Sequence, residues 1–101
     1  MNTKIFGLLT SATVAATGGT AITAPYKTFT AHTVGAGTPC SGTIAIQGTI
    51  DNSSWATLSS NAFTAASGWA YQFNGPWYGV RSTLGGTITG SFTSKLYASD
   101  I

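Results

Sequence analysis

Hydrophobic and polar residues alternate in short segments along this chain, and a period of two is typical of β-strands. In residues 42–50 the alternation places Ile44, Ile46 and Ile50 on one face, which we expect to belong to the core. Residues 69–73 alternate three aromatic side chains with Ala and Gln. No stretch has the 3.6-residue apolar repeat of an amphipathic helix, so the pattern predicts an all-β protein.

Turn residues separate the expected strands at intervals of about 8–12 residues, as in small β-sandwiches. The clearest turn is at residues 51–54, because Asp and Asn side chains accept backbone hydrogen bonds and Asn tolerates a positive φ. A loop is expected at residues 34–42 and a turn at residues 85–86, both rich in Gly. Strands are expected at residues 4–10, 20–24, 26–33, 42–50, 55–59, 61–65, 69–73, 77–83 and 87–93.

This layout predicts a single small antiparallel β-sandwich, jelly-roll or immunoglobulin-like, with about 7–9 short strands. One domain is expected over residues 1–101, because a chain of this length has no room for a second core. Residues 1–7 and 94–101 are expected as extended arms, with residues 94–101 forming a tail or an edge strand. Such arms are suited to pairing with the sheet edge of a neighbouring molecule.

The N-terminal segment has two interpretations. Lys4, the apolar residues 5–9 and the small residues 12–16 imitate a secretory signal, which would make this a secreted bacterial protein cleaved near Ala16. Thr and Ser interrupt the apolar run, however, so a hairpin over residues 4–24 with a turn at residues 18–19 is favoured. No run approaches the roughly 20 apolar residues that span a bilayer, so no membrane anchor is expected.

Composition changes the picture of the surface. Thr, Ser and Gly fill 42 of the 101 positions, whereas charged residues make up only 6%. Such a surface has little like-charge repulsion to keep copies apart, and we expect much of it to be buried against other subunits. The net charge is +2 with no basic cluster, so nucleic-acid binding is not expected.

The residues that perform acid, base or metal chemistry are few. His32 is the only histidine and has no ligand spacing, so it is interpreted as a partly exposed strand residue. Asp51 is explained by its turn, Asp100 lies near the last residue, and no Ser stands in a Gly-x-Ser-x-Gly motif. Cys40 is expected to be a free thiol, which fits assembly inside a cell. No catalytic residue, metal or cofactor is expected, and the chain is predicted not to be an enzyme.

Exposed aromatic residues are the remaining functional signal, because Trp and Tyr on a β-surface stack on sugars or anchor protein interfaces. We expect Trp55 to be buried, together with at least one of the two other tryptophans. Arg81 is expected to pair with a carbonyl group or with Asp51, or to contact another subunit. The candidate interface or glycan-stacking residues are Trp69, Tyr71, Trp77, Tyr78 and Arg81.

Two motifs resemble a family of small bacteriophage virion proteins. The sequence IQGTIDNSSWATL at residues 46–58 is similar to an apolar strand followed by the pattern xGSxDGxxWxxL, and PWYGVR at residues 76–81 is similar to aPWkYVRa. Residues 9–22 and 27–31 resemble the opening strands of that family, so the resemblance covers most of the chain. Two departures affect local geometry: Asn-Ser-Ser replaces a turn that contains Gly, and Gly79 stands where a larger residue is usual.

The resemblance implies a β-sandwich that acts as a capsid decoration (cement) protein or as another head or tail component. It implies a core position for Trp55, a strand position for Arg81 and no catalytic residues. Its partners would be the major capsid protein or other virion proteins, in a homo-oligomer for which a trimer is expected, located in the virion after assembly in the host cytoplasm. The alternative is a carbohydrate-binding β-sandwich of a phage tail or surface adhesin.

Overall fold

The computed structural model describes residues 3–19, 21–23 and 26–100. Over these ranges the chain forms seven strands and no helix, which confirms the all-β prediction. Two of the strands are 22 and 21 residues long. The strands are β1 (Thr3–Ala12), β2 (Ala16–Thr17), β3 (Ala21–Ile22), β4 (Thr28–Thr49), β5 (Ala56–Phe63), β6 (Gly68–Asn74) and β7 (Gly79–Ser99).

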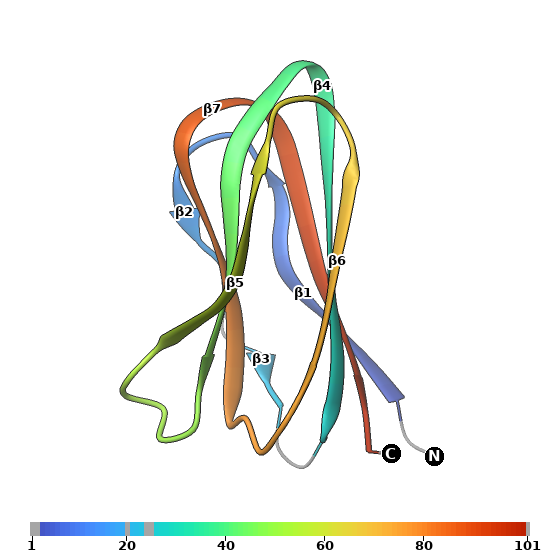
Figure 1. The fold of residues 1–101 in the computed structure, drawn as a ribbon, viewed down its shortest axis with the longest axis vertical. Coiled ribbons are helices and arrows are strands. Elements are labelled where there is room, and N and C mark those ends of the chain that lie inside the picture. Colours follow the sequence, from blue (N-terminus) through green and yellow to red (C-terminus); the bar gives the residue numbers. More distant parts are fainter. Residues whose placement is uncertain (1–2, 20, 24–25, 101) are drawn as a thin grey trace.

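The long strands β4 and β7 form the centre of one continuous antiparallel sheet (Figure 1). They pair from Thr28 opposite Ser99 to Thr49 opposite Gly79. In the first half of the sheet, which contains residues 28–36 and 91–99, β6 borders β4 and β1 borders β7. In the second half, which contains residues 41–49 and 79–89, β5 borders β4, and the short strands β2 and β3 border β7.

Both long strands bend where the two halves join, at the top of Figure 1. The pairing of β4 with β7 shifts register between Ala36 and Ser41. Gly37 and Gly90 have φ angles of 113° and 77°, which residues with a side chain rarely adopt. A Cβ atom on Gly37 would lie 3.1 Å from the Cα atom of Gly90, so the two strands also approach closely here. Glycine therefore lets both strands bend at one place without ending.

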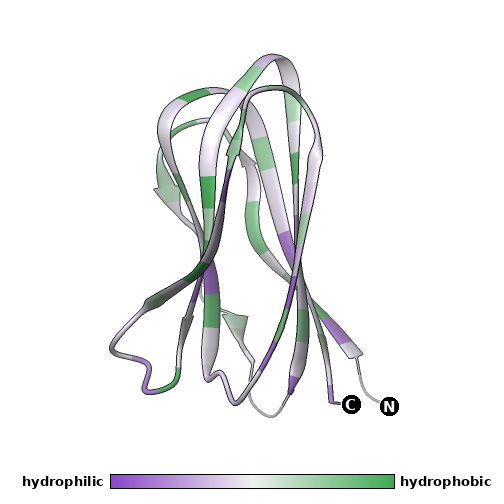
Figure 2. Ribbon diagram, in the orientation of Figure 1, coloured by the Kyte–Doolittle hydropathy of each residue, from purple (hydrophilic) through white to green (hydrophobic). Residues whose placement is uncertain are grey.

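Alternate side chains of the two halves enter one shared core, and Figure 2 shows the resulting hydrophobic segments separated by near-neutral ones along the ribbon. Phe63 on β5 meets Phe92 on β7 edge to face, with ring centroids 5.2 Å apart. Because β5 borders the second half and Phe92 lies in the first half, the contact joins the halves. Each large apolar side chain buried in this way contributes roughly 1.5–3 kcal/mol. The buried apolar residues are Leu8, Leu9, Ala21, Phe29, Ala31, Cys40, Ile44, Ile46, Phe63, Val80, Leu84, Phe92, Leu96 and Ala98.

The observed arrangement of strands differs from the predicted sandwich of short strands. The described strands belong to one sheet rather than to two separate sheets built from short strands. The expected loop at residues 34–42 lies inside β4, and the expected turn at residues 85–86 lies inside β7. Gly, Pro and Ser weaken the local strand pattern there, but each long strand continues because the other remains its hydrogen-bonding partner on both sides of the bend.

The N-terminal hairpin predicted for residues 4–24 does not form among the described residues. β1, β2 and β3 each pair with β7 instead of with one another. Leu8 and Leu9 enter the core, so cleavage near Ala16 would remove a strand with two core leucines. Residues 20 and 24 of the expected second strand, and Pro25 after it, lie outside the described residues.

The C-terminal segment is central in the sheet, so the expectation of a free arm or edge strand at residues 94–101 is wrong for the described part. β7 pairs here with β1 on one side and with β4 on the other. Leu96 and Ala98 are 0% and 3% exposed. Residues 3–7 are likewise paired, within β1, whereas residues 1–2 and 101 lie outside the described residues. Deletion of residues 94–101 would therefore remove a core strand.

The alternating segments between the two long strands form strands close to the predicted positions. Residues 55–59 and 61–65 were expected as two strands and instead contribute to one, β5, while residues 69–73 lie in β6. Ile44 and Ile46 are buried as predicted, but Ile50 is 62% exposed. The reason is that β4 ends at Thr49, so the alternation no longer applies to the next residue.

Trp77 lies against the backbone of β4 at Gly48. A Cβ atom on Gly48 would lie 2.7 Å from Cε3 of the Trp77 ring, closer than side chains pack. The absence of a side chain at this residue therefore allows the indole to cover the strand.

We predict that Gly48→Ala destabilises the protein by about 1–3 kcal/mol, because the indole ring has to move away from the new methyl group. Urea unfolding followed by tryptophan fluorescence measures the change. Gly85→Ala is the matched control, since a Cβ atom there has no neighbour within 4 Å. Equal stability of the two variants would contradict this packing.

Candidate functional site

Two of the predicted aromatic residues, Trp69 and Tyr71, lie together on β6. Their rings stack with centroids 6.2 Å apart and planes 16° apart, and Tyr71 stacks on Phe73 at 5.5 Å and 18°. Phe73 in turn stacks on the buried Phe29 of β4 at 5.1 Å. We call Trp69, Tyr71 and Phe73 the aromatic ladder. All three side chains are half-buried, so the ladder is attached to the core at one end and stays partly open along β6.

The other two aromatic candidates, Trp77 and Tyr78, lie in the connection between β6 and β7. The Nε1 group of Trp77 donates a hydrogen bond to the carbonyl oxygen of Asn74 at 3.0 Å. The hydroxyl group of the buried Thr23 donates to the carbonyl oxygen of Trp77 at 2.6 Å. Tyr78 is 38% exposed. Stacking on a sugar needs a free ring face, and among the four aromatic candidates Tyr78 is exposed whereas the other three are half-buried.

Arg81 contacts Trp55, which was expected from the sequence to lie in the core. Its guanidinium group lies 4.0 Å from the centroid of the Trp55 ring, within the range of a cation–π contact. Its Nε group donates to Oε1 of Gln47 at 2.8 Å, and Nε2 of Gln47 donates to the hydroxyl oxygen of Thr57 at 3.3 Å. Because Gln47 pairs with Arg81 on one side and with Thr57 on the other, these contacts cross three strands. We call Gln47, Trp55, Thr57 and Arg81 the Arg81 surface.

The Arg81 surface bears on two expectations. Trp55 is half-buried rather than a core residue, and the other two tryptophans are half-buried as well. Arg81 does pair with a carbonyl oxygen, the side-chain amide Oε1 of Gln47, rather than with Asp51, and its guanidinium group also stacks on Trp55. Sequence reasoning missed this cluster because the register of β4 against β7 places Gln47 beside Arg81, and no local pattern encodes that register.

Asp51 has the structural role in a turn that was predicted. Its Oδ1 atom accepts hydrogen bonds from the N–H groups of Ser54 and Ser53 at 2.8 and 2.9 Å, and from the hydroxyl group of Thr49 at 3.1 Å. These donors hold the pKa of the carboxyl group below its ordinary value of 3.8, the Ser54 bond most of all. Asn52 has the positive φ expected for it, at 61°.

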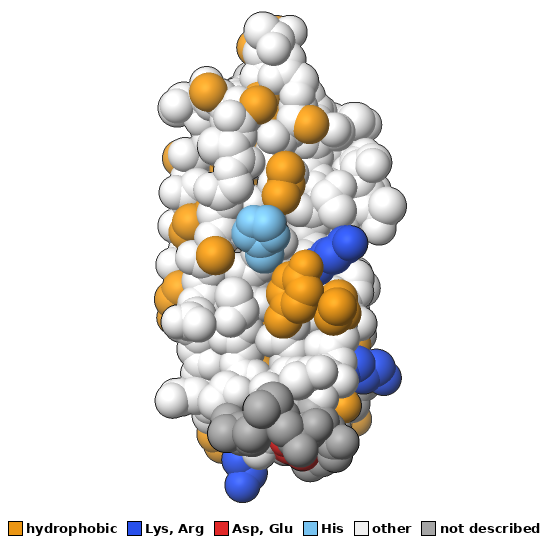
Figure 3. Space-filling model, turned by 90° about the vertical axis from the view of Figure 1, so that its right-hand side faces the viewer, with side chains coloured by type: hydrophobic (Ala, Val, Ile, Leu, Met, Phe, Trp, Pro, Cys, Tyr) orange, Lys and Arg blue, Asp and Glu red, His pale blue; other side chains and the backbone are white. Residues whose placement is uncertain are grey.

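The outward face of the first half carries scattered apolar and basic side chains. Figure 3 looks onto a face on which the histidine lies near the middle, with hydrophobic groups above and below it and basic groups at the right edge and at the bottom. His32 is half-buried in β4, opposite Lys95 of β7, in agreement with its interpretation as a strand residue. Tyr97 and Ile5 are 41% and 61% exposed and lie opposite each other on β7 and β1.

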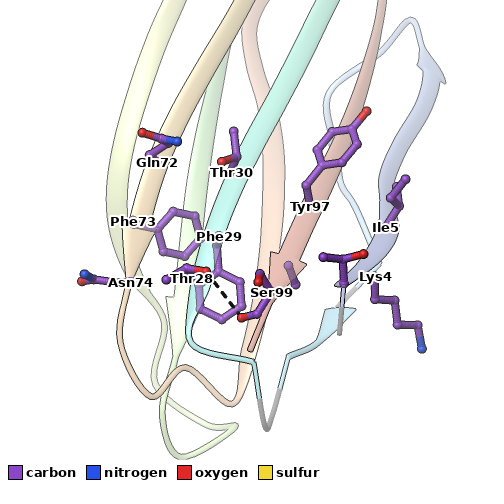
Figure 4. A pocket seen from close by; sticks show the side chains of 12 residues that line it. Lys4, Ile5, Thr28, Phe29, Thr30, Gln72, Phe73, Asn74, Tyr97 and Ser99 are labelled. Carbon is purple, nitrogen blue, oxygen red and sulfur yellow. Dashed lines mark hydrogen bonds between the residues drawn. The ribbon is translucent and has the colours of Figure 1, made fainter. Parts of the chain in front are cut away.

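A groove of about 740 Å³ lies at the end of the sheet where β1 and β4 begin and where β6 and β7 end (Figure 4). Among the described residues that line it, Lys4 is the one that carries a charge, and its Nζ atom lies 5.0 Å from the centroid of the Phe6 ring. A hydroxyl, amide and aromatic lining is suited to contact with a polypeptide or a polar ligand. The lining residues are Thr3, Lys4, Ile5, Thr28, Phe29, Thr30, Gln72, Phe73, Asn74, Tyr97, Ala98 and Ser99.

The described residues contain no group of three or more His, Cys, Asp or Glu side chains that could hold a metal ion. Cys40 is a free thiol, as predicted, and is 1% exposed within β4.

In the described ranges no helix has the length and apolar character needed to cross a membrane.

Comparison with known proteins found structures with a similar fold but no match in sequence. No protein-family model matches it, and no curated protein matches it in sequence. The crystal structure of SPBc2 prophage-derived protein YomS is similar, with a TM-score of 0.75 and 18% identity over 96% of this chain and 92% of that chain. The crystal structure of PBSX exported protein XepA has a TM-score of 0.65 and 15% identity over 99% of this chain.

The chain covers 37% of the XepA chain, so it corresponds to a part of that protein. A third similar structure comes from Bacillus endospore appendages, which are described as a novel family of disulfide-linked pili. Its TM-score is 0.50 and its identity 13%, over 97% of this chain and 85% of that chain. The chain therefore shares its antiparallel β fold with the prophage-derived protein YomS and with a part of the exported protein XepA.

We predict that Asp51→Asn lowers stability at pH 7 and that this loss shrinks as the pH falls below about 4. The sign follows from the lowered pKa: the charged carboxylate stabilises the folded state above its unfolded pKa, and this stabilisation disappears as the group is protonated. Urea unfolding of both proteins between pH 7 and pH 2 measures it.

Ser53→Ala is the control, because it retains the N–H donor and the carboxylate. A difference between wild type and Asp51→Asn that stays constant with pH would contradict the role of the charge.

Proposed function

We propose that this chain is a non-enzymatic structural protein of a bacteriophage particle. The observation that carries the proposal is the fold shared with SPBc2 prophage-derived protein YomS over 96% of this chain and with PBSX exported protein XepA over 99% of it. The motif resemblance at residues 46–58 and 76–81 supports the same class from the sequence. Proteins that act in many copies need repeated surfaces rather than reactive groups, and the low charge and high hydroxyl content suit such surfaces.

Within this class we propose a capsid decoration protein that binds the major capsid protein and reinforces the head. A small module can act in this way because many simultaneous weak contacts on a lattice add up through avidity. Cys40 is buried, so the proposed attachment is non-covalent and uses no disulfide.

The Arg81 surface is the proposed contact with another virion protein. Trp and Arg are the residues that most often dominate the energy of protein interfaces. Arg81 is half-buried, and stacking on Trp55 restricts its side chain before any partner arrives. Its Nε group donates to Gln47, which leaves the terminal N–H groups to donate to a carboxylate or carbonyl oxygen of the partner.

The glycan-binding alternative has weaker support. The rings of Trp69 and Tyr71 stack on their neighbours in the aromatic ladder, and Trp77 covers the backbone of β4. Each of these contacts occupies ring surface that a sugar would need.

We expect the protein in purified particles from cells that carry its gene, in a copy number similar to that of the major capsid protein. Quantitative mass spectrometry of separated heads and tails measures this. Enrichment in heads supports decoration, enrichment in tails supports another structural role, and absence from both would overturn the proposal. Particles that lack the chain are expected to release their genome at a lower temperature.

The Arg81 surface is tested by rebinding. Purified Arg81→Gln is expected to bind particles that lack the chain about ten-fold more weakly than wild type, because a preorganised charged donor is lost. Lys95→Gln removes the same charge from the other end of β7 and is expected to bind normally. Equal binding by both variants would show that Arg81 is not in the interface.

A further inference from the structure

The backbone of β6 has one unpaired side. Gly35 N donates to the carbonyl oxygen of Ser67, and Gly75 N donates to that of Lys27. Because peptide groups alternate in direction along a strand, the odd-numbered residues of β6 direct theirs toward β4. The even-numbered residues direct theirs away from β4, where no strand of the described ranges pairs with them. These outward residues are Gly68, Ala70, Gln72 and Asn74.

β6 lacks the features that usually protect such an edge from pairing with another chain. Native edges are blunted by charges, prolines or bulges. No Asp, Glu, Lys, Arg or His occurs anywhere in residues 52–80, and β6 contains no Pro. Its pairing with β4 has no register shift, whereas the outer strands β1 and β5 both have irregular pairing with their neighbours. The edge is therefore regular and uncharged.

The sequence of β6 is also complementary to itself in the antiparallel direction. Aromatic residues occupy positions 69, 71 and 73, symmetrically about the central residue of the strand, Tyr71. If two copies of β6 pair about Tyr71, Trp69 of one lies opposite the partner's Phe73, and Ala70 lies opposite the partner's Gln72. Facing aromatic residues stabilise antiparallel pairs, and a small residue opposite a larger one avoids crowding. The same register makes the outward residues the hydrogen-bonded pairs, as their direction requires.

We propose that β6 is a self-association edge, at which two copies of this chain join antiparallel about a two-fold axis through Tyr71. The two sheets then become continuous across the dimer, and the partly open aromatic ladders of the two copies cover each other. A second copy fits better than a different protein, because an uncharged and self-complementary edge has no feature that selects another sequence. An isologous contact of this kind closes at two subunits.

Ala70→Pro tests the proposed hydrogen bonds. The N–H group of residue 70 points away from β4, so proline removes a donor from the edge and none from the sheet of its own chain. Sedimentation equilibrium of the full chain at several concentrations is expected to show a dimer for wild type and about ten-fold weaker dimerisation for the variant. A wild-type monomer or trimer, or unchanged dimerisation of a folded Ala70→Pro, would overturn the proposal.

A charge provides a second test that does not depend on proline being tolerated. Ala70→Lys places a cation on the edge and is expected to weaken the dimer. Ala62→Lys is the matched control: it makes the same change at an exposed alanine of β5, the outer strand on the other half of the sheet. Equal weakening by both would indicate general repulsion and contradict the β6 edge.

Cross-linking tests the register. Tyr71→Cys is expected to form a disulfide-linked dimer under a mild oxidant, because facing residues on the axis bring their Cβ atoms within about 4.5–5.5 Å. Gln72→Cys faces the partner's Ala70 instead and is expected to cross-link far less. The native Cys40 is buried and gives little background. Cross-linking of both variants to the same extent would contradict the two-fold axis at Tyr71.

Discussion

The pairing of β4 with β7 is the constraint on which the rest of the structure depends. The two long strands provide the backbone of both halves of the sheet, and every other strand borders one of them. Because both bend where Gly37 and Gly90 meet, the two halves share a core in which Phe63 contacts Phe92. A change in this register by one residue would turn every inward side chain outward. The pairing of β4 with β7 therefore determines which side chains form the core and which form the surface.

The same pairing determines which side chains are available to a partner. It places Gln47 between Thr57 and Arg81, so that one hydrogen-bonded row crosses three strands and ends under the Trp55 ring. It also leaves β6 paired on one side alone in the described part of the chain. The two surfaces differ in character: one presents a preorganised cation, and the other presents backbone groups and aromatic rings. We therefore propose the first surface as the contact with a different protein and the second as the contact between copies of this chain.

Much of the local structure could be predicted from residues close together in the sequence. Alternation located β6 and the inward faces of Ile44 and Ile46, and turn chemistry located the Asp51 carboxylate and the positive φ of Asn52. The candidate site was predicted only in part. Trp69 and Tyr71 do lie together, but Trp55 was assigned to the core. An aromatic residue beside a turn can lie either in the core or on the surface. For Trp55 the location depends on Arg81, which a different strand brings beside it.

The amino-acid sequence by itself determined the strand content, the turn at residues 51–54, the scarcity of charge and the free thiol, because these depend on composition and on neighbours a few residues apart. Only the tertiary structure decided that residues 34–42 and 85–86 continue strands, that residues 94–99 are central and that the N-terminal strands pair with β7. The physical reason is that strand pairing depends on hydrogen bonds between residues far apart in the chain. Distant partners can override local signals such as glycine, and no short segment contains the information about which partner it will meet.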